Sequence, residues 1–235
     1  MPPSHPLDRP VWAALFGRQA PLSLGDGRAR RMHPDYGPFA AAASYSPDDL
    51  AGLSDLSDNA EGLALVEPEG APLPAAMEVL GQAPCWQMQL RSLTADACAP
   101  PEILPLGDAD AAEMLALATL TKPGPFATRT HALGRFLGVK RDGRLIAMAG
   151  ERMQPEGFTE VSGVCALPEA RGQGLAGALM RAVIANILKR GEVPILHAYA
   201  ENQGAIQLYQ RLGFTYRRTL ILTRIRPQSP GESTR

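Results

Sequence analysis

The residues best suited to chemistry lie in the stretch Val164-Cys-Ala-Leu-Pro-Glu-Ala-Arg171-Gly-Gln-Gly174-Leu-Ala176, whose pattern is typical of a strand, a sharp turn and the start of a helix. Gly172 and Gly174 carry no Cβ, so the first amide N–H groups of the helix are uncovered. These amides, together with the positive end of the helix dipole, favour an anion. The stretch therefore predicts a binding site for a phosphate or pyrophosphate group.

The same glycines also satisfy the G-x-G-x-x-G pattern of dinucleotide-binding folds, through Gly172, Gly174 and Gly177, and Glu192 follows twenty residues after Gly172. In that fold the first glycine ends a strand, whereas here four residues from Pro168 intervene, and Glu192 precedes the next predicted strand. This context disfavours a dinucleotide site. A Walker loop is excluded because no Gly-Lys-Ser/Thr follows the glycines.

The elements around this turn are predicted from periodicity and turn residues. Apolar residues at i, i+4 spacing, beginning with Leu175 and Leu179, predict a helix over 175–189 that lies on a sheet. Before it, Asp142-Gly143 predicts a hairpin between strands 136–140 and 145–153, followed by a strand over 158–167.

After this helix, a strand is expected over 195–199. Asn202 is expected to cap a helix over 203–212 that Gly213 ends, and a last strand is expected over 216–224.

A helix is also predicted from Asp110 to about Leu120, because Asp110 and Glu113 have the spacing of a capping box, and a loop should follow over 121–126. Paired prolines within 96–105 resist helix and central strand, and they favour a boundary between an N-terminal α/β region (1–100) and a second domain (101–226).

In the N-terminal region we expect a helix capped by Ser46 and strands over 61–67 and 85–91, and we find no catalytic motif. Residues 227–235 are expected to be a disordered tail.

Composition limits the classes of function. The chain has 235 residues, 45% of them hydrophobic, and no apolar run approaches the roughly 18–20 residues that span a bilayer, so we expect a soluble, cytoplasmic protein without a membrane partner. Cys85, Cys98 and Cys165 lack metal-ligand spacing, so no metal is expected.

The net charge of −1 gives no case for nucleic-acid binding. The charge is uneven: residues 1–100 hold 6 Lys/Arg against 12 Asp/Glu, and residues 101–235 hold 17 against 12. One interpretation is that the C-terminal half receives an anionic cofactor, and the other is that these are solvated faces.

Two segments resemble the GNAT superfamily of N-acetyltransferases. Arg171-Gly-Gln-Gly174-Leu-Ala is similar to the Q/R-x-x-G-x-G/A signature, and the segment from Asn202 to Phe214 is similar to N-x-x-A-x-x-L-Y-x-x-x-G-F. The resemblance covers roughly residues 103–226. It implies an α+β fold with a mixed, mostly antiparallel sheet flanked by helices, and a degenerate GNAT half is one possibility for residues 1–100.

The resemblance implies an N-acetyltransferase that moves an acetyl group from acetyl-CoA to a primary amine by direct transfer in a ternary complex. Backbone groups of Val164, Cys165 and Ala166 would contact the pantetheine and the thioester. The residues implied to hold the pyrophosphate are Arg171, Gly172, Gln173, Gly174, Leu175 and Ala176.

Two further roles follow from the resemblance. Tyr209 matches the general acid that protonates the departing thiolate, since a phenol of pKa about 10 is an available donor to a thiolate of pKa about 8.5. Asn202 would contact CoA as well as cap its helix. The alternative for Tyr209 is a structural role, with its side chain in the core beside Ile206. The alternative for Asn202 is that it only caps its helix.

The general base is predicted less directly. Glu151 and Glu160 would face each other across a hairpin centred between Pro155 and Glu156, and opposed like charges in a sheet favour a functional use. The alternative is a pair of exposed strand-end carboxylates. His131 and His197 are weaker candidates.

Three other hypotheses remain open. A covalent acyl-enzyme at Cys165 is disfavoured because no His or Asp lies near it in the sequence. A non-catalytic CoA-binding sensor or interaction protein could keep the fold, and the acyl group could be longer than acetyl. The acceptor is expected to be a small-molecule or peptide amine, and the oligomeric state is not predicted.

Overall fold

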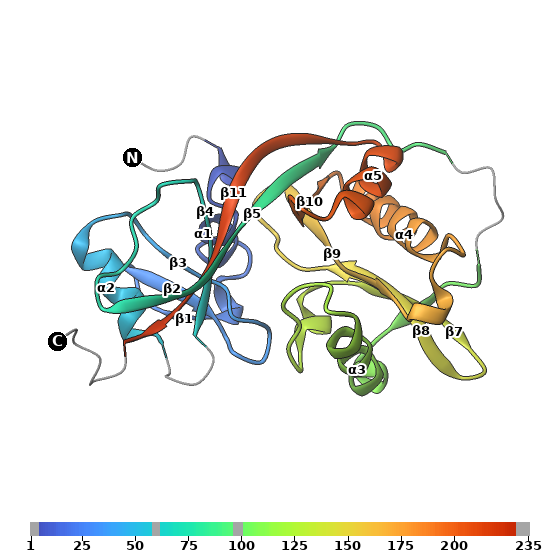
Figure 1. Cartoon of the computed structure of the whole chain (residues 1–235), viewed down its shortest axis with the longest axis horizontal. Helices are drawn as coiled ribbons and strands as arrows, with labels where there is room; N and C mark the ends of the chain where they lie inside the picture. Colours follow the sequence, from blue (N-terminus) through green and yellow to red (C-terminus); the bar gives the residue numbers. More distant parts are fainter. Residues whose placement is uncertain (1–4, 58–61, 96–100, 229–235) are drawn as a thin grey trace. The chain divides into compact units, whose positions relative to one another are not determined.

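The computed structural model describes residues 5–57, 62–95 and 101–228, shown in Figure 1. Its residues form two compact units: the first unit comprises Met1–Pro34, Pro38–Cys85 and Thr219–Arg235, and the second comprises Asp35–Gly37 and Trp86–Arg218. These limits differ from the domain limits expected from the sequence. Most of the predicted tail, and residues 96–100 of the predicted boundary, lie outside the described residues.

The first unit contains an additional N-terminal sheet. Its three strands have the order β1-β2-β3 and are antiparallel, and β4 pairs with β11 from Leu63 opposite Ile225 to Glu67 opposite Ile221. The helices and strands of this part are α1 (Pro10–Leu15), β1 (Ser23–Gly25), β2 (Ala29–Met32), β3 (Ala40–Ala42), α2 (Pro47–Asp55), β4 (Leu63–Glu67) and β5 (Met77–Leu90). The Ser46 side chain caps α2, as predicted.

The second unit is built on a sheet with the strand order β5-β10-β9-β8-β7-β6. Strands β6–β7, β7–β8 and β8–β9 pair antiparallel and β9–β10 pairs parallel, so the sheet is mixed and mostly antiparallel, which confirms the expected fold class. Its elements after β5 are β6 (Leu104–Leu106), α3 (Ala111–Thr121), β7 (Phe136–Arg141), β8 (Arg144–Glu151), β9 (Phe158–Ala166), α4 (Leu175–Lys189), β10 (Val193–Tyr199), α5 (Gln203–Leu212) and β11 (Phe214–Pro227).

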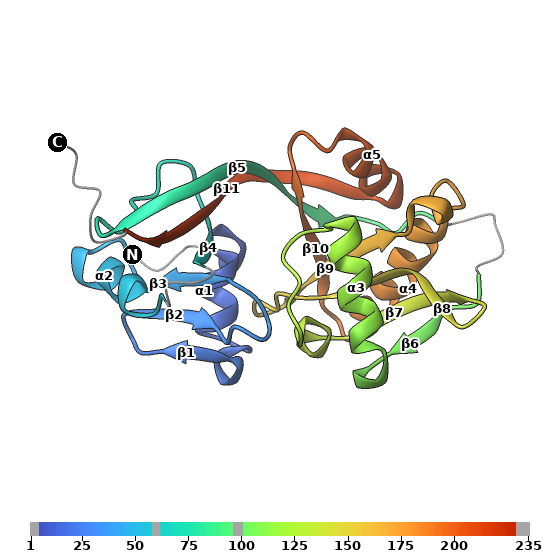
Figure 2. The same ribbon diagram turned by 60° about the horizontal axis from the view of Figure 1, so that its bottom comes forward.

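Helices cover both faces of this sheet. The views in Figures 1 and 2 place α3 and α4 on opposite faces. Helix α4 buries its apolar stripe, including Leu179, Val183 and Ile187, against strands β7 to β10. Burial of this stripe fixes α4 on the sheet, and its N-terminus therefore lies directly after the turn that follows β9.

Strands β9 and β10 are paired only over a short distance. The paired residues run from Val193 with Phe158 to Ile195 with Glu160. Both strands continue beyond these pairs, β9 to Ala166 and β10 to Tyr199. The last residues of β9 therefore do not use this neighbour for their backbone hydrogen bonds.

A β-bulge changes the register between β8 and β9. Met148 faces Cys165, but Gly150 faces Ser162 and Glu151 faces Val161. Gly163 has φ +63, and a Cβ there would lie 2.9 Å from the Phe136 ring, so the bulge requires glycine. The prediction that Glu151 and Glu160 face each other was wrong, because the register is offset by one residue.

The predicted capping box on α3 is also wrong in detail. The Asp110 carboxylate accepts a hydrogen bond from the Gly107 amide and pairs with Lys140, and it makes no cap hydrogen bond to α3. The Glu113 carboxylate instead accepts a hydrogen bond from the backbone amide of Leu145.

The short 3₁₀ helices are Pro6–Asp8, Ala20–Leu22, Asp108–Asp110, Thr130–Leu133 and Pro168–Ala170. No helix in the described part of the chain is long and apolar enough to cross a membrane.

Candidate functional site

A cavity of about 570 Å³ lies in the second unit, where β9 leaves β10. It brings together the end of β9, the glycine turn, the start of α4 and one face of α5. The predicted residues among its lining are Val164, Cys165, Ala166, Arg171, Gly172, Gly174, Leu175, Ala176, Asn202 and Tyr209. Two segments nearly forty residues apart in the sequence therefore form one site.

The glycine turn has the backbone geometry that the sequence predicts. Gly172 and Gly174 have φ +75 and +76, in the left-handed region, and Gly174 is the residue that precedes α4. Other residues are strained at such φ values. No heavy atom would lie within 4 Å of a Cβ at either position, so the amides of this turn are open to a ligand.

The charge around the cavity is positive. Lys122, Arg171 and Arg211 line it, and no carboxylate does. The side chains of these three cations make no hydrogen bond or ion pair with another described residue. The cavity is therefore suited electrostatically to an anionic ligand.

Gln173 is the one predicted cofactor residue of the turn that does not line the cavity. Its side chain accepts a hydrogen bond from Arg141 at 2.8 Å and donates one to the carbonyl of Glu169 at 3.0 Å. These bonds tie the turn to the end of strand β7.

Helix α5 presents its N-terminus and one face to the cavity. The Asn202 side chain accepts a hydrogen bond from the backbone amide of Ala205 at 3.1 Å, which is the predicted N-terminal cap of α5. Gly213 ends the helix with φ +101. Gly204 and Leu208 also line the cavity.

Tyr209 lies on this face of α5. Its ring contacts Phe214 edge-on, and its hydroxyl has no hydrogen bond to any described residue. Burial raises the pKa of the Tyr209 hydroxyl to about 12. The group therefore stays protonated at neutral pH and can donate a hydrogen bond to a ligand.

Cys165 lines the cavity but is poorly suited to be a nucleophile. Burial raises the pKa of its thiol to about 11, although a hydrogen bond from Thr121 and the charge of Arg171 act in the opposite direction. Because the thiolate is the reactive form, this environment disfavours a covalent acyl-enzyme.

Sequence comparison identifies the family. A model of the FR47-like protein family matches residues 136–222. An acetyltransferase from the GNAT family of Novosphingobium aromaticivorans is 48% identical, and its crystal structure matches with a TM-score of 0.89 over 96% of this chain and 100% of that chain. The chain belongs to the GNAT family of acetyltransferases.

More distant structures share the fold of this GNAT protein. A GCN5-related N-acetyltransferase from Kribbella flavida is 17% identical, with a TM-score of 0.64 over 93% of this chain and 95% of that one. A GCN5-related N-acetyltransferase-like protein from Streptococcus suis is 15% identical, with a TM-score of 0.59 over 92% of each chain. A search of curated proteins found no match.

The two carboxylates predicted as bases do not line the GNAT cavity. Glu160 is fully buried and accepts four hydrogen bonds: from Nε and Nη2 of Arg152, the amide of Met153 and Nδ1 of His197. Burial alone would raise the pKa of Glu160, but Arg152 and His197 hold it well below its usual range. An anion this strongly stabilised is a weak proton acceptor.

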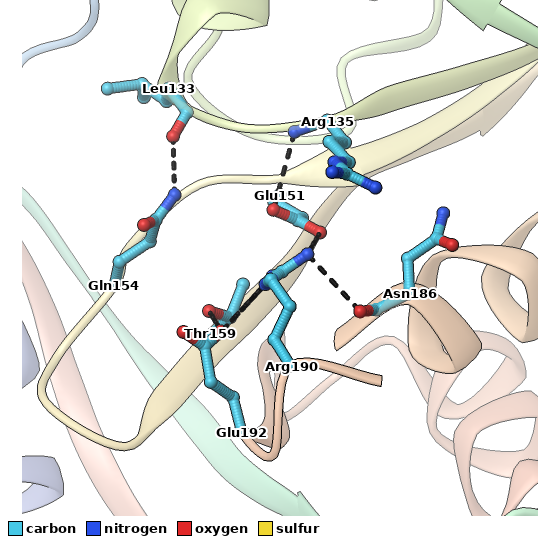
Figure 3. A network of polar contacts seen from close by, with 8 residues as sticks. All are labelled: Leu133, Arg135, Glu151, Gln154, Thr159, Asn186, Arg190 and Glu192. Carbon is cyan, nitrogen blue, oxygen red and sulfur yellow. Dashed lines mark hydrogen bonds and ion pairs between the residues drawn. The ribbon is translucent and has the colours of Figure 1, made fainter. Parts of the chain in front are cut away.

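Glu151 belongs to a separate network, shown in Figure 3. Nη1 of Arg190, at the end of α4, donates to its carboxylate at 3.0 Å, and the amide of Arg135 donates at 3.4 Å. Arg190 also pairs with Glu192, which accepts a hydrogen bond from Thr159 at 2.6 Å. These contacts tie the C-terminal end of α4 to the sheet.

The weaker base candidates have different surroundings. His131 is buried and pairs through Nε2 with Asp108 at 2.8 Å, whereas His197 lies beside Glu160. Among the described residues, no group of three or more His, Cys, Asp or Glu side chains could hold a metal ion.

Several lining residues were not predicted as site residues: Thr121, Lys122, Pro123, Ala170, Gly177, Gly204, Ala205, Leu208 and Arg211. The helical spacing of Ala205, Leu208 and Tyr209 predicts that they share one face of α5. The site residues of α5, including Arg211, could therefore have been predicted from the sequence. Lys122 could not, because its position depends on a left-handed residue at the end of α3, with φ 51.

Proposed function

We propose that this GNAT protein transfers an acetyl group from acetyl-CoA to a primary amine within a ternary complex. One observation carries the proposal: a single positive cavity is lined both by the open glycine turn and by Tyr209 on α5, whose hydroxyl has no hydrogen-bond partner among the described residues. A thioester cofactor with a diphosphate matches both features.

Each part of the cavity would have a distinct task. The amides from Gly172 to Ala176 would bind the pyrophosphate at the start of α4, and Arg171, Lys122 and Arg211 would add charge. Backbone groups of Val164 to Ala166 would bind the pantetheine, since β9 has left β10 there.

The reaction would proceed by direct attack. An uncharged amine adds to the thioester carbonyl and the C–S bond breaks. The thiolate of CoA takes a proton from the Tyr209 hydroxyl, and the phenolate regains a proton from the amine nitrogen, which becomes the amide. The phenol pKa of about 12 keeps Tyr209 protonated until the thiolate forms beside it. The thiolate is the weaker base, with a thiol pKa of about 8.5, so its protonation by Tyr209 depends on the phenolate taking the amine proton in turn. Asn202 would contact CoA from the N-terminus of α5.

Calorimetric titration with acetyl-CoA tests the cofactor assignment. We expect Gly174→Glu to abolish measurable binding, because the side chain enters the anion site with a negative charge. Gly191→Glu is the matched control, since Gly191 has φ +74, has no heavy atom within 4 Å of a Cβ, and follows the other end of α4. Equal affinity of wild type and Gly174→Glu would refute the assignment.

A second candidate function is CoA binding without turnover. The Tyr209 hydroxyl, which has no partner among the described residues, favours an enzyme. Assays with acetyl-CoA and a panel of primary amines separate the two functions. The panel should contain a polyamine, an amino sugar, an amino acid and a peptide with a free N-terminus. Binding of acetyl-CoA with no acetylated product from any amine would favour the sensor.

A further inference from the structure

The three cations of the cavity come from three different elements. Arg171 directly precedes the glycine turn and the open amides at the start of α4, so it is the cation beside the proposed diphosphate site. Lys122 ends α3, and Arg211 lies in the last turn of α5. No carboxylate lines the cavity. The charge of the last two cations is therefore available to another anionic group of the same ligand.

Helix α5 presents two rows of side chains to the cavity. In a helix of about 3.6 residues per turn, Gly204, Leu208 and Arg211 fall in one row. Ala205 and Tyr209 fall in the neighbouring row. All five residues line the cavity. The cation and the proposed general acid therefore belong to different rows of the same helix.

The row that contains Arg211 faces the start of α4. Helices α4 and α5 are neighbours, as Figure 1 shows. A Cβ at Gly177, in the first turn of α4, would lie 3.8 Å from Cδ1 of Leu208. Arg211 follows Leu208 on this row within about one helical turn. Arg211 is therefore on the side of α5 that meets the glycine-turn end of the cavity.

Lys122 enters the cavity from another direction. It has φ 51 at the end of α3, and the preceding residue, Thr121, makes a hydrogen bond with the thiol of Cys165 on β9. Cys165 belongs to the segment that would bind the pantetheine. Of the two remaining cations, Arg211 is therefore the one next to the proposed diphosphate site.

The guanidinium of Arg211 is available to a ligand. The residue is exposed, and its side chain makes no hydrogen bond or ion pair within the part of the chain that the structure describes. Its position in the last turn of α5 also complements the helix dipole, which is the structural alternative for this cation.

We propose that Arg211 recognises the 3′-phosphate of CoA, so that the cavity selects CoA over 3′-dephospho-CoA; this inference rests on the proposed function. The 3′-phosphate is attached to the ribose that carries the diphosphate, so a cation that recognises it must lie close to the diphosphate site. A phosphate monoester has a charge of about −1.5 to −2 at pH 7. The planar fork of guanidinium donors matches its oxygens.

The test is calorimetric titration of wild type and Arg211→Gln with CoA and with 3′-dephospho-CoA. We expect wild type to bind CoA about tenfold more tightly than 3′-dephospho-CoA, the size of one charge-assisted contact. Arg211→Gln should bind both ligands with the affinity that wild type shows for 3′-dephospho-CoA. Arg211→Lys should retain part of the preference, because it keeps the charge and loses the fork.

Two matched variants control for charge. Arg171→Gln should weaken the binding of both ligands by the same factor, because both contain the diphosphate. Lys189→Gln removes an exposed cation at the other end of α4, outside the cavity lining, and should bind both ligands like wild type. Loss of the preference for CoA in Arg171→Gln, with its retention in Arg211→Gln, would overturn the inference.

Three results therefore have separate meanings. Equal affinity of wild type for CoA and 3′-dephospho-CoA would overturn the inference and leave the proposed function standing. An equal loss for both ligands in Arg211→Gln would also overturn it, because Arg211 would then act on the diphosphate or only on α5. If wild type binds neither CoA nor acetyl-CoA, the proposed function itself fails, and the inference fails with it.

Discussion

The cavity and the buried ion pairs use the same kinds of side chain in opposite ways. Arg171, Lys122 and Arg211 line the cavity without a partner among the described residues. In contrast, Arg152 and Arg190 are held by the buried carboxylates of Glu160 and Glu151. Paired charges support the fold in one region, and unpaired charges remain available for a ligand in the other.

This difference explains why charge type alone misidentifies function in this protein. Glu151 and Glu160 have the chemistry of a base, but each is already occupied by donors. Tyr209 is a weak acid, but its hydroxyl makes no hydrogen bond in the part of the chain that the structure describes. The predictions below test the distinction, beginning with the largest effect.

The distinction between paired and unpaired charges would be contradicted most clearly if removing a paired charge left the free energy of unfolding unchanged. Glu160→Ala removes the partner of a mostly buried arginine, and such losses cost about 3–5 kcal/mol in unfolding free energy. Urea denaturation measures this loss. Glu169→Ala is the control: its pair with Arg144 is 59% and 65% exposed, so about 0–1 kcal/mol is expected.

The same pair has a defined pH dependence. The pKa of Glu160 is lower in the folded protein than in the unfolded chain, where it is about 4.3. Its stabilisation is therefore fully present above that pH and is lost as the pH falls. The difference in unfolding free energy between wild type and Glu160→Ala should become smaller as the pH is lowered. A difference that does not change with pH would contradict the lowered pKa of Glu160.

Two tyrosines sharpen the comparison for hydroxyl groups. Tyr209→Phe should lower kcat about tenfold or more with little change in stability, because its hydroxyl binds no described residue. Tyr45→Phe should leave kcat unchanged and cost about 1 kcal/mol, because the Tyr45 hydroxyl donates to Glu67 at 2.8 Å. Amine acetylation rates and urea denaturation together measure both effects, and the reverse pattern would refute our assignment.

The smallest effect concerns the unpaired cations. Arg171→Gln should weaken acetyl-CoA binding about fivefold at low salt, and the difference should shrink as salt screens the interaction. Calorimetry at two salt concentrations measures this change. Arg144→Gln, which alters a paired cation outside the cavity lining, should bind like wild type; an equal loss in both variants would indicate only a general charge effect.

The local parts of the fold could be predicted from the sequence. The apolar spacing of Leu179, Val183 and Ile187 predicts α4, and its observed bounds of Leu175 to Lys189 confirm the prediction. Asn202 and Gly213 likewise mark the ends of α5. These signals depend on residues a few positions apart, so no tertiary information is needed.

The parts that were missed depend on tertiary structure. The sheet strands β2 and β3 contain buried alanines such as Ala29 and Ala40, which do not carry a strong strand signal. The partners of Glu160 come from residues before β9 and from β10, and only the folded sheet brings them together. A prediction from spacing alone cannot distinguish an occupied carboxylate from a free one.

The bulge at Gly163 has a consequence for how this protein tolerates sequence change. The residues of β9 before it, including Glu160, belong to the ion-paired part of the sheet, and the residues after it line the cavity. Deleting Gly163 would remove the extra residue and give β8 and β9 one continuous register, with Met148 still opposite Cys165 and Gly150 opposite Ser162. The cost of that deletion would be the local bend and twist that the bulge gives β9 immediately before the residues that line the cavity.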